Sequence, residues 1–154
     1  MISYILYVCI VLFLTYLGYF FSGKYRHRKS FYIAWEQFHQ NFLSEIGYTR
    51  RPLKEVIEKF KTDGYFSDFL TDYNKNHAWD GKIDFFNREE NEFLSEYFSF
   101  LGKSDYLRQK EYFNATTKRI EELKENSEVD AKKYTDLYVK LGFLLGLIIV
   151  ILLV

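Results

Sequence analysis

The stretch Leu141-Gly142-Phe143-Leu144-Leu145-Gly146-Leu147-Ile148-Ile149-Val150-Ile151-Leu152-Leu153-Val154 contains no polar side chain. It ends a run that has no proline from Tyr106 onward and no glycine before Gly142. The run predicts one helix from Asp105 to Val154, about 75 Å long at about 1.5 Å per residue. This helix would begin in water and end in lipid, and no catalytic motif lies on it.

A second apolar run extends from Ile2 to Phe21 near the N-terminus. A helix of about 20 residues spans about 30 Å, the thickness of the hydrocarbon core of a bilayer. A signal peptide would need positive charge before the run and a small-residue cleavage site after it. The basic residues Lys24, Arg26, Arg28 and Lys29 instead follow the run. We therefore expect an uncleaved membrane anchor.

The same basic cluster predicts the direction of insertion, because positively charged flanks remain in the cytoplasm. Lysines also precede the second apolar run, at Lys132, Lys133 and Lys140. We expect an integral membrane protein with an N-terminal transmembrane helix at 1–23, a cytoplasmic helical domain at 24–136 and a C-terminal transmembrane helix at 137–154. The alternative role of the cluster from Lys24 to Lys29 is simple contact with lipid headgroups.

Small residues recur four apart in both apolar runs, as Gly18-x-x-x-Ser22 and Gly142-x-x-x-Gly146. This spacing lets helices approach closely in lipid, although glycine is also common in membrane helices generally. If the spacing is used, the partner would be the antiparallel first span of the same chain or a neighbouring subunit. The second span is short, about 21 Å from Leu141 onward, so its docking would depend on the first span.

The middle of the chain predicts an all-α fold, a small bundle of about five to six helices between the two spans. Its long last helix would continue into the second span. Apolar steps of three and four predict a helix over Ser30–Ile46, which would continue from the first apolar run with Ser22-Gly23 as the only soft point. The same steps predict another helix over Tyr65–Tyr73, with Phe66, Phe69, Leu70 and Tyr73 inward. Between them, Pro52 would start a helix, since proline suits the first helical position. Asp63-Gly64 is a turn signal.

The next helix is predicted to begin at Asn87, with Glu90 as the reciprocal partner of this N-cap. Its buried face would comprise Phe93, Leu94, Tyr97, Phe98 and Leu101. Gly102 fits the left-handed residue that closes a helix, and Ser104 or Asp105 can cap the long helix that follows. The second half of that helix would pack on the N-terminal helix or on another copy of the chain.

Composition and motifs give no sign of an enzyme. The charges balance, with 21 Lys plus Arg against 21 Asp plus Glu, which does not favour nucleic acid as a partner. The single cysteine, Cys9, excludes a disulfide within the chain. His27, His39 and His77 lie far apart, and we expect Glu36 and His39 to form a solvated pair rather than ligands. We expect neither a metal nor another cofactor.

Three motifs together resemble the stage III sporulation protein AB family. They are Glu45-Ile46-x-Tyr48, Pro52-Leu53 and Leu101-Gly102-x-Ser104-Asp105-x-x-x-Gln109. The resemblance covers the whole chain, and the third motif is the most specific of the three. The sequence departs from the family at Thr49, where glycine is frequent, at Arg51, where threonine is frequent, and at Tyr97-Phe98, which replaces a Phe-Gly pair.

The resemblance implies a non-enzymatic membrane platform in the channel complex between mother cell and forespore, in the mother-cell membrane that surrounds the forespore. The soluble part would be similar to the helical domain of the inner-membrane platform protein of type II secretion and type IV pilus systems. Implied partners are a cytoplasmic ATPase, the AA protein of the same complex, and other channel subunits. Homo-oligomerisation is also open.

Pro52, Gly102, Ser104, Asp105 and Gln109 would then form structural corners, or corners that also present Asp105 and Gln109 to a partner. Two other functions remain open. A membrane-tethered coiled-coil adaptor or sensor would form homodimers through the last helix alone. A small membrane enzyme would need ionisable residues inside the spans, where only Lys140 is available, at an edge.

Overall fold

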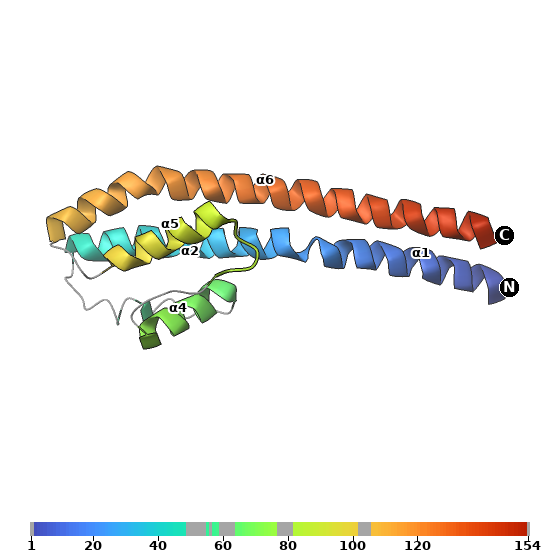
Figure 1. Cartoon of the computed structure of the whole chain (residues 1–154), viewed down its shortest axis with the longest axis horizontal. Coiled ribbons are helices and arrows are strands. Elements are labelled where there is room, and N and C mark those ends of the chain that lie inside the picture. The colour runs from blue at the N-terminus through green and yellow to red at the C-terminus, as the bar shows by residue number, and fades with distance from the viewer. Residues whose placement is uncertain are drawn as a thin grey trace. The chain divides into compact units, whose positions relative to one another are not determined.

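The computed structural model describes residues 2–48, 55, 57–58, 64–76, 82–101 and 106–153. Within these ranges the chain is all-helical, which confirms the predicted fold class. The helices are α1 (Ile2–Phe21), α2 (Gly23–Tyr48), α4 (Tyr65–Asn76), α5 (Arg88–Phe100) and α6 (Tyr106–Leu153) (Figure 1). The long C-terminal helix is therefore continuous over 48 residues and includes the apolar stretch that ends the sequence.

A single residue, Ser22, separates α1 from α2. Its hydroxyl donates a hydrogen bond of 2.7 Å to the carbonyl of Tyr19. A serine that bonds back to the preceding turn commonly bends a helix, which explains why the break lies here. The predicted soft point at Ser22-Gly23 is thus present, and the helix predicted from Ser30 begins earlier, at Gly23.

The chain divides into two compact units, which we describe separately. The first unit combines residues 1–29 with residues 126–154, and the second unit comprises residues 30–125. Both α2 and α6 contribute residues to each unit. This division into compact units does not test the membrane boundaries predicted at residues 23 and 136, which stay a prediction.

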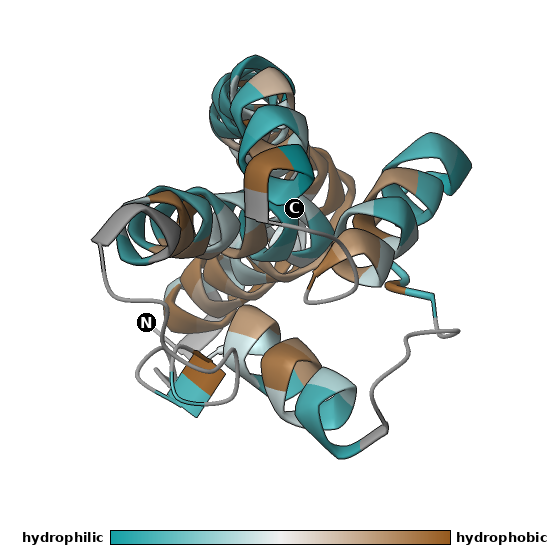
Figure 2. Cartoon of the chain, turned by 90° about the vertical axis from the view of Figure 1, so that its left-hand side faces the viewer, coloured by the Kyte–Doolittle hydropathy of each residue, from teal (hydrophilic) through white to brown (hydrophobic). Residues whose placement is uncertain are grey.

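The second unit is built around an aromatic core. Its fully buried centre is Trp35 of α2, whose ring lies 5.2 Å from Tyr97 and 5.3 Å from Phe93 of α5. The predicted inward faces are confirmed, since all of the following side chains are buried: Phe66, Phe69, Leu70, Tyr73, Phe93, Leu94, Tyr97, Phe98 and Leu101. Each large apolar side chain stabilises the fold by about 1.5–3 kcal/mol on burial. Hydrophobic and hydrophilic residues share the short helices, as Figure 2 shows.

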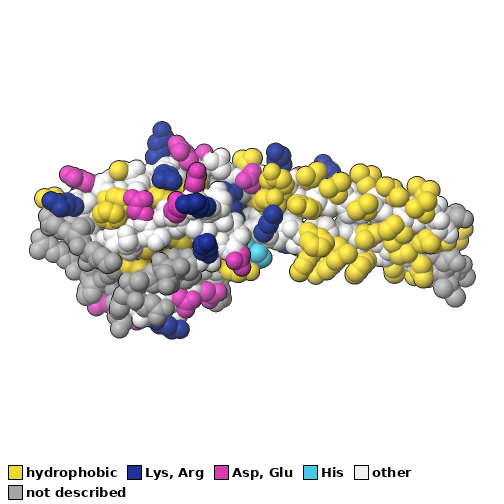
Figure 3. All heavy atoms as spheres, in the orientation of Figure 1, with side chains coloured by type: hydrophobic (Ala, Val, Ile, Leu, Met, Phe, Trp, Pro, Cys, Tyr) yellow, Lys and Arg dark blue, Asp and Glu magenta, His cyan; other side chains and the backbone are white. Residues whose placement is uncertain are grey.

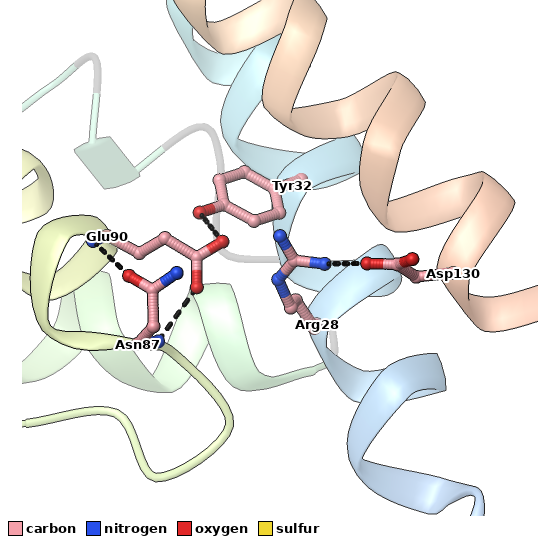
Figure 4. Close-up of polar contacts among 5 residues, drawn as sticks. All are labelled: Arg28, Tyr32, Asn87, Glu90 and Asp130. Carbon is pink, nitrogen blue, oxygen red and sulfur yellow. Dashed lines mark hydrogen bonds and ion pairs between the residues drawn. The ribbon is translucent and has the colours of Figure 1, made fainter. Parts of the chain in front are cut away.

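Two local signals place α4 and α5 as the sequence predicts. Gly64 has φ +126°, and its carbonyl accepts hydrogen bonds from the amides of Ser67 and Asp68 at the start of α4. At the start of α5, the amide of Glu90 donates to the side chain of Asn87 and the amide of Asn87 donates to the carboxylate of Glu90, each at 2.8 Å. The hydroxyl of Tyr32 also donates to buried Glu90, at 2.9 Å (Figure 4). This capping box therefore ties α5 to α2.

Candidate functional site: the paired apolar helices

Many large apolar side chains of the first unit are exposed. Two helices are long and apolar enough to cross a membrane: α1, over Tyr4–Phe21, and α6, through its C-terminal part. Only 6% of the apolar stretch of α1 and 11% of the apolar stretch of α6 are buried. On the face drawn in Figure 3, hydrophobic side chains cover this unit almost continuously. Large exposed apolar patches mark membrane or protein contacts, so these helices are consistent with a membrane protein.

The two apolar helices run antiparallel and touch at glycines. A Cβ on Gly18 would collide with the carbonyl oxygen of Tyr138, and one on Gly142 would collide with the carbonyl oxygen of Leu14. At Gly146 a Cβ would stand 2.9 Å from the Cα of Val11. Such contacts need residues without a side chain, because any Cβ would push the two backbones apart.

The three glycines singled out in the sequence thus lie on one contact line between α1 and α6 of the same chain. Ser22, the fourth small residue, is fully buried. The sequence left open whether α6 packs on the N-terminal helix or on another copy, and in the structure it packs on the N-terminal helix. The role of these glycines inside a lipid bilayer stays a prediction.

A polar and aromatic clamp continues the pairing at the end of the apolar region. The rings of Tyr25 and Tyr134 stack with centroids 4.1 Å apart and planes 11° apart. The Arg28 guanidinium donates to Asp130 at 3.0 Å (Figure 4), and the Arg28 side chain is only 15% exposed. A half-buried ion pair is screened by salt less than a surface pair.

Two arginines of the basic cluster that follows α1 contact other groups of the protein. Besides the ion pair of Arg28, the guanidinium of Arg26 lies 3.7 Å from the ring centroid of Tyr19 and donates to the Tyr19 carbonyl at 3.2 Å. Neither contact was predicted from the sequence. For Arg26, the separation of seven residues from Tyr19, about two helical turns, was the available signal.

Of the predicted corner residues, Pro52, Gly102, Ser104 and Asp105 lie outside the described residues. Gln109 is described, on the first turns of α6. Its side-chain amide donates at 3.4 Å to the carbonyl of Phe100, the last residue of α5. The ring of Phe100 stacks on Tyr112 of α6 at 4.3 Å. Gln109 thus satisfies a carbonyl that the end of a helix leaves unpaired.

The expectation of a solvated Glu36–His39 pair is wrong. His39 is fully buried, with Nδ1 2.9 Å from the Tyr97 hydroxyl and Nε2 2.9 Å from Thr117. Glu36 pairs instead with Lys124 of α6 at 2.9 Å. The Thr117 hydroxyl donates to the carbonyl of Phe113, so it accepts from Nε2–H, and Nδ1 then accepts from Tyr97.

Burial controls the ionisation of this network. It lowers the pKa of His39 to about 4, and nearby Glu36 only partly opposes the shift. Burial also raises the pKa of Tyr97 well above its usual value. His39 and Tyr97 are therefore neutral at physiological pH, as is the hydroxyl of Thr117. The network joins α2, α5 and α6. Local sequence patterns do not predict contacts between residues so far apart in the chain.

Within the ranges that the structure describes, no three His, Cys, Asp or Glu side chains are arranged to hold a metal ion. Cys9 is exposed on α1. The candidate functional site is therefore the helix pair with its clamp.

The family described as stage III sporulation protein AB matches residues 3–154, nearly the whole chain. No curated protein and no solved structure matches significantly. The match extends over both apolar helices and the aromatic bundle between them. With the sequence motifs, the helix pair and this coverage in agreement, the chain belongs to the stage III sporulation protein AB family, a family of sporulation proteins.

Proposed function

We propose that the protein is a non-enzymatic membrane platform of the channel complex between mother cell and forespore. The paired helices α1 and α6 would hold the aromatic bundle at the cytoplasmic face of the mother-cell membrane around the forespore. The bundle would engage a secretion-type ATPase, the AA protein of the same complex, together with other channel subunits.

The observation that carries this proposal is the glycine contact line of α1 and α6 in a chain of this family. A platform needs a fixed attachment, and two antiparallel spans in close contact resist rotation better than one span. The ion pair of Arg28 with Asp130 and the stacked rings of Tyr25 and Tyr134 extend this attachment beyond the apolar region.

The alternative is a coiled-coil adaptor or sensor that forms homodimers through the last helix alone. In the structure, Gly142 and Gly146 of that helix contact α1 of the same chain. A homodimer through this face would have to displace α1. The internal pairing therefore favours the platform.

Co-purification from sporulating cells tests the platform. The tagged wild-type chain should recover the ATPase and further channel subunits from solubilised membranes. The double variant Asp105→Ala/Gln109→Ala should remain folded and membrane-bound while its ATPase recovery falls at least tenfold, because both proposed contact residues are gone. Glu111→Ala, an exposed position on the same helix, is the matched control and should recover the ATPase normally.

Two results would contradict the proposal. Full ATPase recovery by the folded double variant would remove the contact role of Asp105 and Gln109. Recovery of nothing but further copies of the chain would favour the adaptor.

A further inference from the structure

The second unit has an open cleft of about 350 Å³ beside α4. Its lining residues come from α2, from α4 and from the segment that precedes α5: Phe31, Tyr65, Asp68, Phe69, Asp72, Ile83, Asp84 and Phe85. A volume of this size lies at the lower end of the range for binding sites of small ligands or single large side chains. Neither the helix pair nor its clamp contributes to this cleft.

The floor and one wall of the cleft are aromatic. Phe31 and Phe69 are nearly fully buried, with ring centroids 5.8 Å apart. Phe85 lies 6.1 Å from Phe31 and 5.4 Å from Tyr65, whose ring meets it edge to face. Tyr65 is 47% exposed, so an aromatic face remains available at the opening. A ring face attracts cations through its quadrupole.

The rim of the cleft carries three exposed carboxylates, those of Asp68, Asp72 and Asp84. Asp68 and Asp72 are four residues apart on α4, a spacing at which like charges repel and weaken the helix. In the described part of the chain none of the three accepts a hydrogen bond or an ion pair from a protein group. The nearby cations Lys75 and Lys82 are exposed and form no ion pair with them there.

We propose that this cleft binds an arginine of a basic segment in a partner protein. A guanidinium stacks on aromatic rings and donates in a planar fork to carboxylates, so the exposed ring of Tyr65 and the carboxylates of the rim fit its two properties. The carboxylates repel the phosphate of a nucleic acid or of an anionic lipid headgroup. They do not form a metal-binding group within the described residues, so a bound metal ion is not the favoured occupant. This proposal stands whether or not the partner is an ATPase.

The occupied cleft would also relieve the repulsion between Asp68 and Asp72. One bound guanidinium placed between them replaces this repulsion by two charge-assisted hydrogen bonds. Binding should therefore depend on the charge of the ligand, weaken as salt rises, and require the carboxylates of α4 more than those elsewhere.

The test measures fluorescence polarisation of a labelled peptide, Gly-Ser-Arg-Phe-Arg-Ser-Gly, with the full chain in detergent micelles. Empty micelles serve as the blank. Asp68→Asn/Asp72→Asn should weaken binding at least tenfold. Glu121→Gln/Glu125→Gln removes the same charge from exposed residues with the same spacing on α6, and it should change the affinity less than twofold. Replacing both arginines of the peptide by neutral citrulline should also abolish binding.

A second variant separates the effect of the aromatic lining on binding from the effect of charge. Phe85→Leu keeps the carboxylates and should weaken binding severalfold, and an unchanged melting temperature shows that the fold is intact. Three results would overturn the proposal. The first is an equal loss of peptide affinity in Asp68→Asn/Asp72→Asn and in Glu121→Gln/Glu125→Gln, which would mean that general charge attraction holds the peptide. The second is undiminished binding of the citrulline peptide. The third is a change of oligomeric state in Asp68→Asn/Asp72→Asn, which makes a second copy the occupant.

Discussion

At the scale of single residues, His39 shows how burial changes the chemistry of a side chain. Its two ring nitrogens are both bonded, one to Tyr97 and one to Thr117, and the ring has no exposed surface. A buried imidazole without partners would cost about 1–3 kcal/mol, so the network stabilises the aromatic core only while it is complete. Protonation would add a donor where Nδ1 now accepts from Tyr97.

We therefore predict that the protein loses stability as the pH falls from 7 to 5. The folded pKa of His39 is lowered to about 4, whereas an unfolded histidine has a pKa of about 6.5. Above pH 6.5 both states are neutral and the full stability is present. Between these values only the unfolded state binds the proton, so the free energy of unfolding should fall by up to about 2 kcal/mol by pH 5. Denaturation of the full chain in detergent, followed by circular dichroism, measures this.

His39→Gln is the matched control, because glutamine can still donate and accept hydrogen bonds but does not titrate. Its stability at pH 7 should be lower than that of the wild type, and its dependence on pH over this range should be much flatter. If wild type and variant lost the same free energy between pH 7 and 5, His39 would not be the titrating group.

At the scale of elements, the pairing of α1 with α6 combines apolar helices with small residues. Lipid is as apolar as leucine, so burial alone does not drive two helices together in a membrane. Close contact of the backbones must do so, and the glycines at Gly18, Gly142 and Gly146 permit it. The antiparallel order follows from the chain, because α6 returns toward the end at which α1 began (Figure 1).

We predict that Gly142→Leu separates the two helices, because its side chain would meet the backbone of Leu14. Cysteines at Tyr25 and Tyr134, in a Cys9→Ser background, should form a disulfide within one chain, since these two rings stack. Gly142→Leu should slow this cross-link at least tenfold. Leu145→Phe adds bulk at an exposed position of α6 and should leave the rate unchanged.

The same cross-link distinguishes the partners that the sequence left open. Disulfides that form between chains, seen as dimers on a non-reducing gel, would assign the glycine contacts to neighbouring subunits. A Gly142→Leu variant that cross-links at the wild-type rate would show that close backbone contact is not required.

At the scale of the whole molecule, we predict that both termini lie outside the cytoplasm and that the aromatic bundle lies inside. Single cysteines report this in intact cells, again in the Cys9→Ser background. A cysteine at Lys118 should resist a membrane-impermeant maleimide until the membrane is opened, whereas a cysteine at Ser3 should react at once. Lys118 is suitable because its side chain is 86% exposed, whereas that of Lys124 is only 29% exposed.

Rapid labelling at Lys118 from outside would overturn this topology and with it the proposed cytoplasmic ATPase contact. Labelling at neither position before the membrane is opened would place the N-terminus inside. The positive charges after α1 would then not set the orientation.

The sequence by itself determined the features that depend on neighbours along the chain. Apolar periodicity predicted which faces of α4 and α5 are buried, and the spacing of Asn87 and Glu90 predicted their capping box, because helical turns bring such residues together whatever surrounds them. Only the tertiary structure decided that His39 is buried against Tyr97 and Thr117, and that Arg28 pairs with Asp130. These contacts join residues from distant parts of the chain, and their energies depend on burial and distance, which arise only when the helices pack.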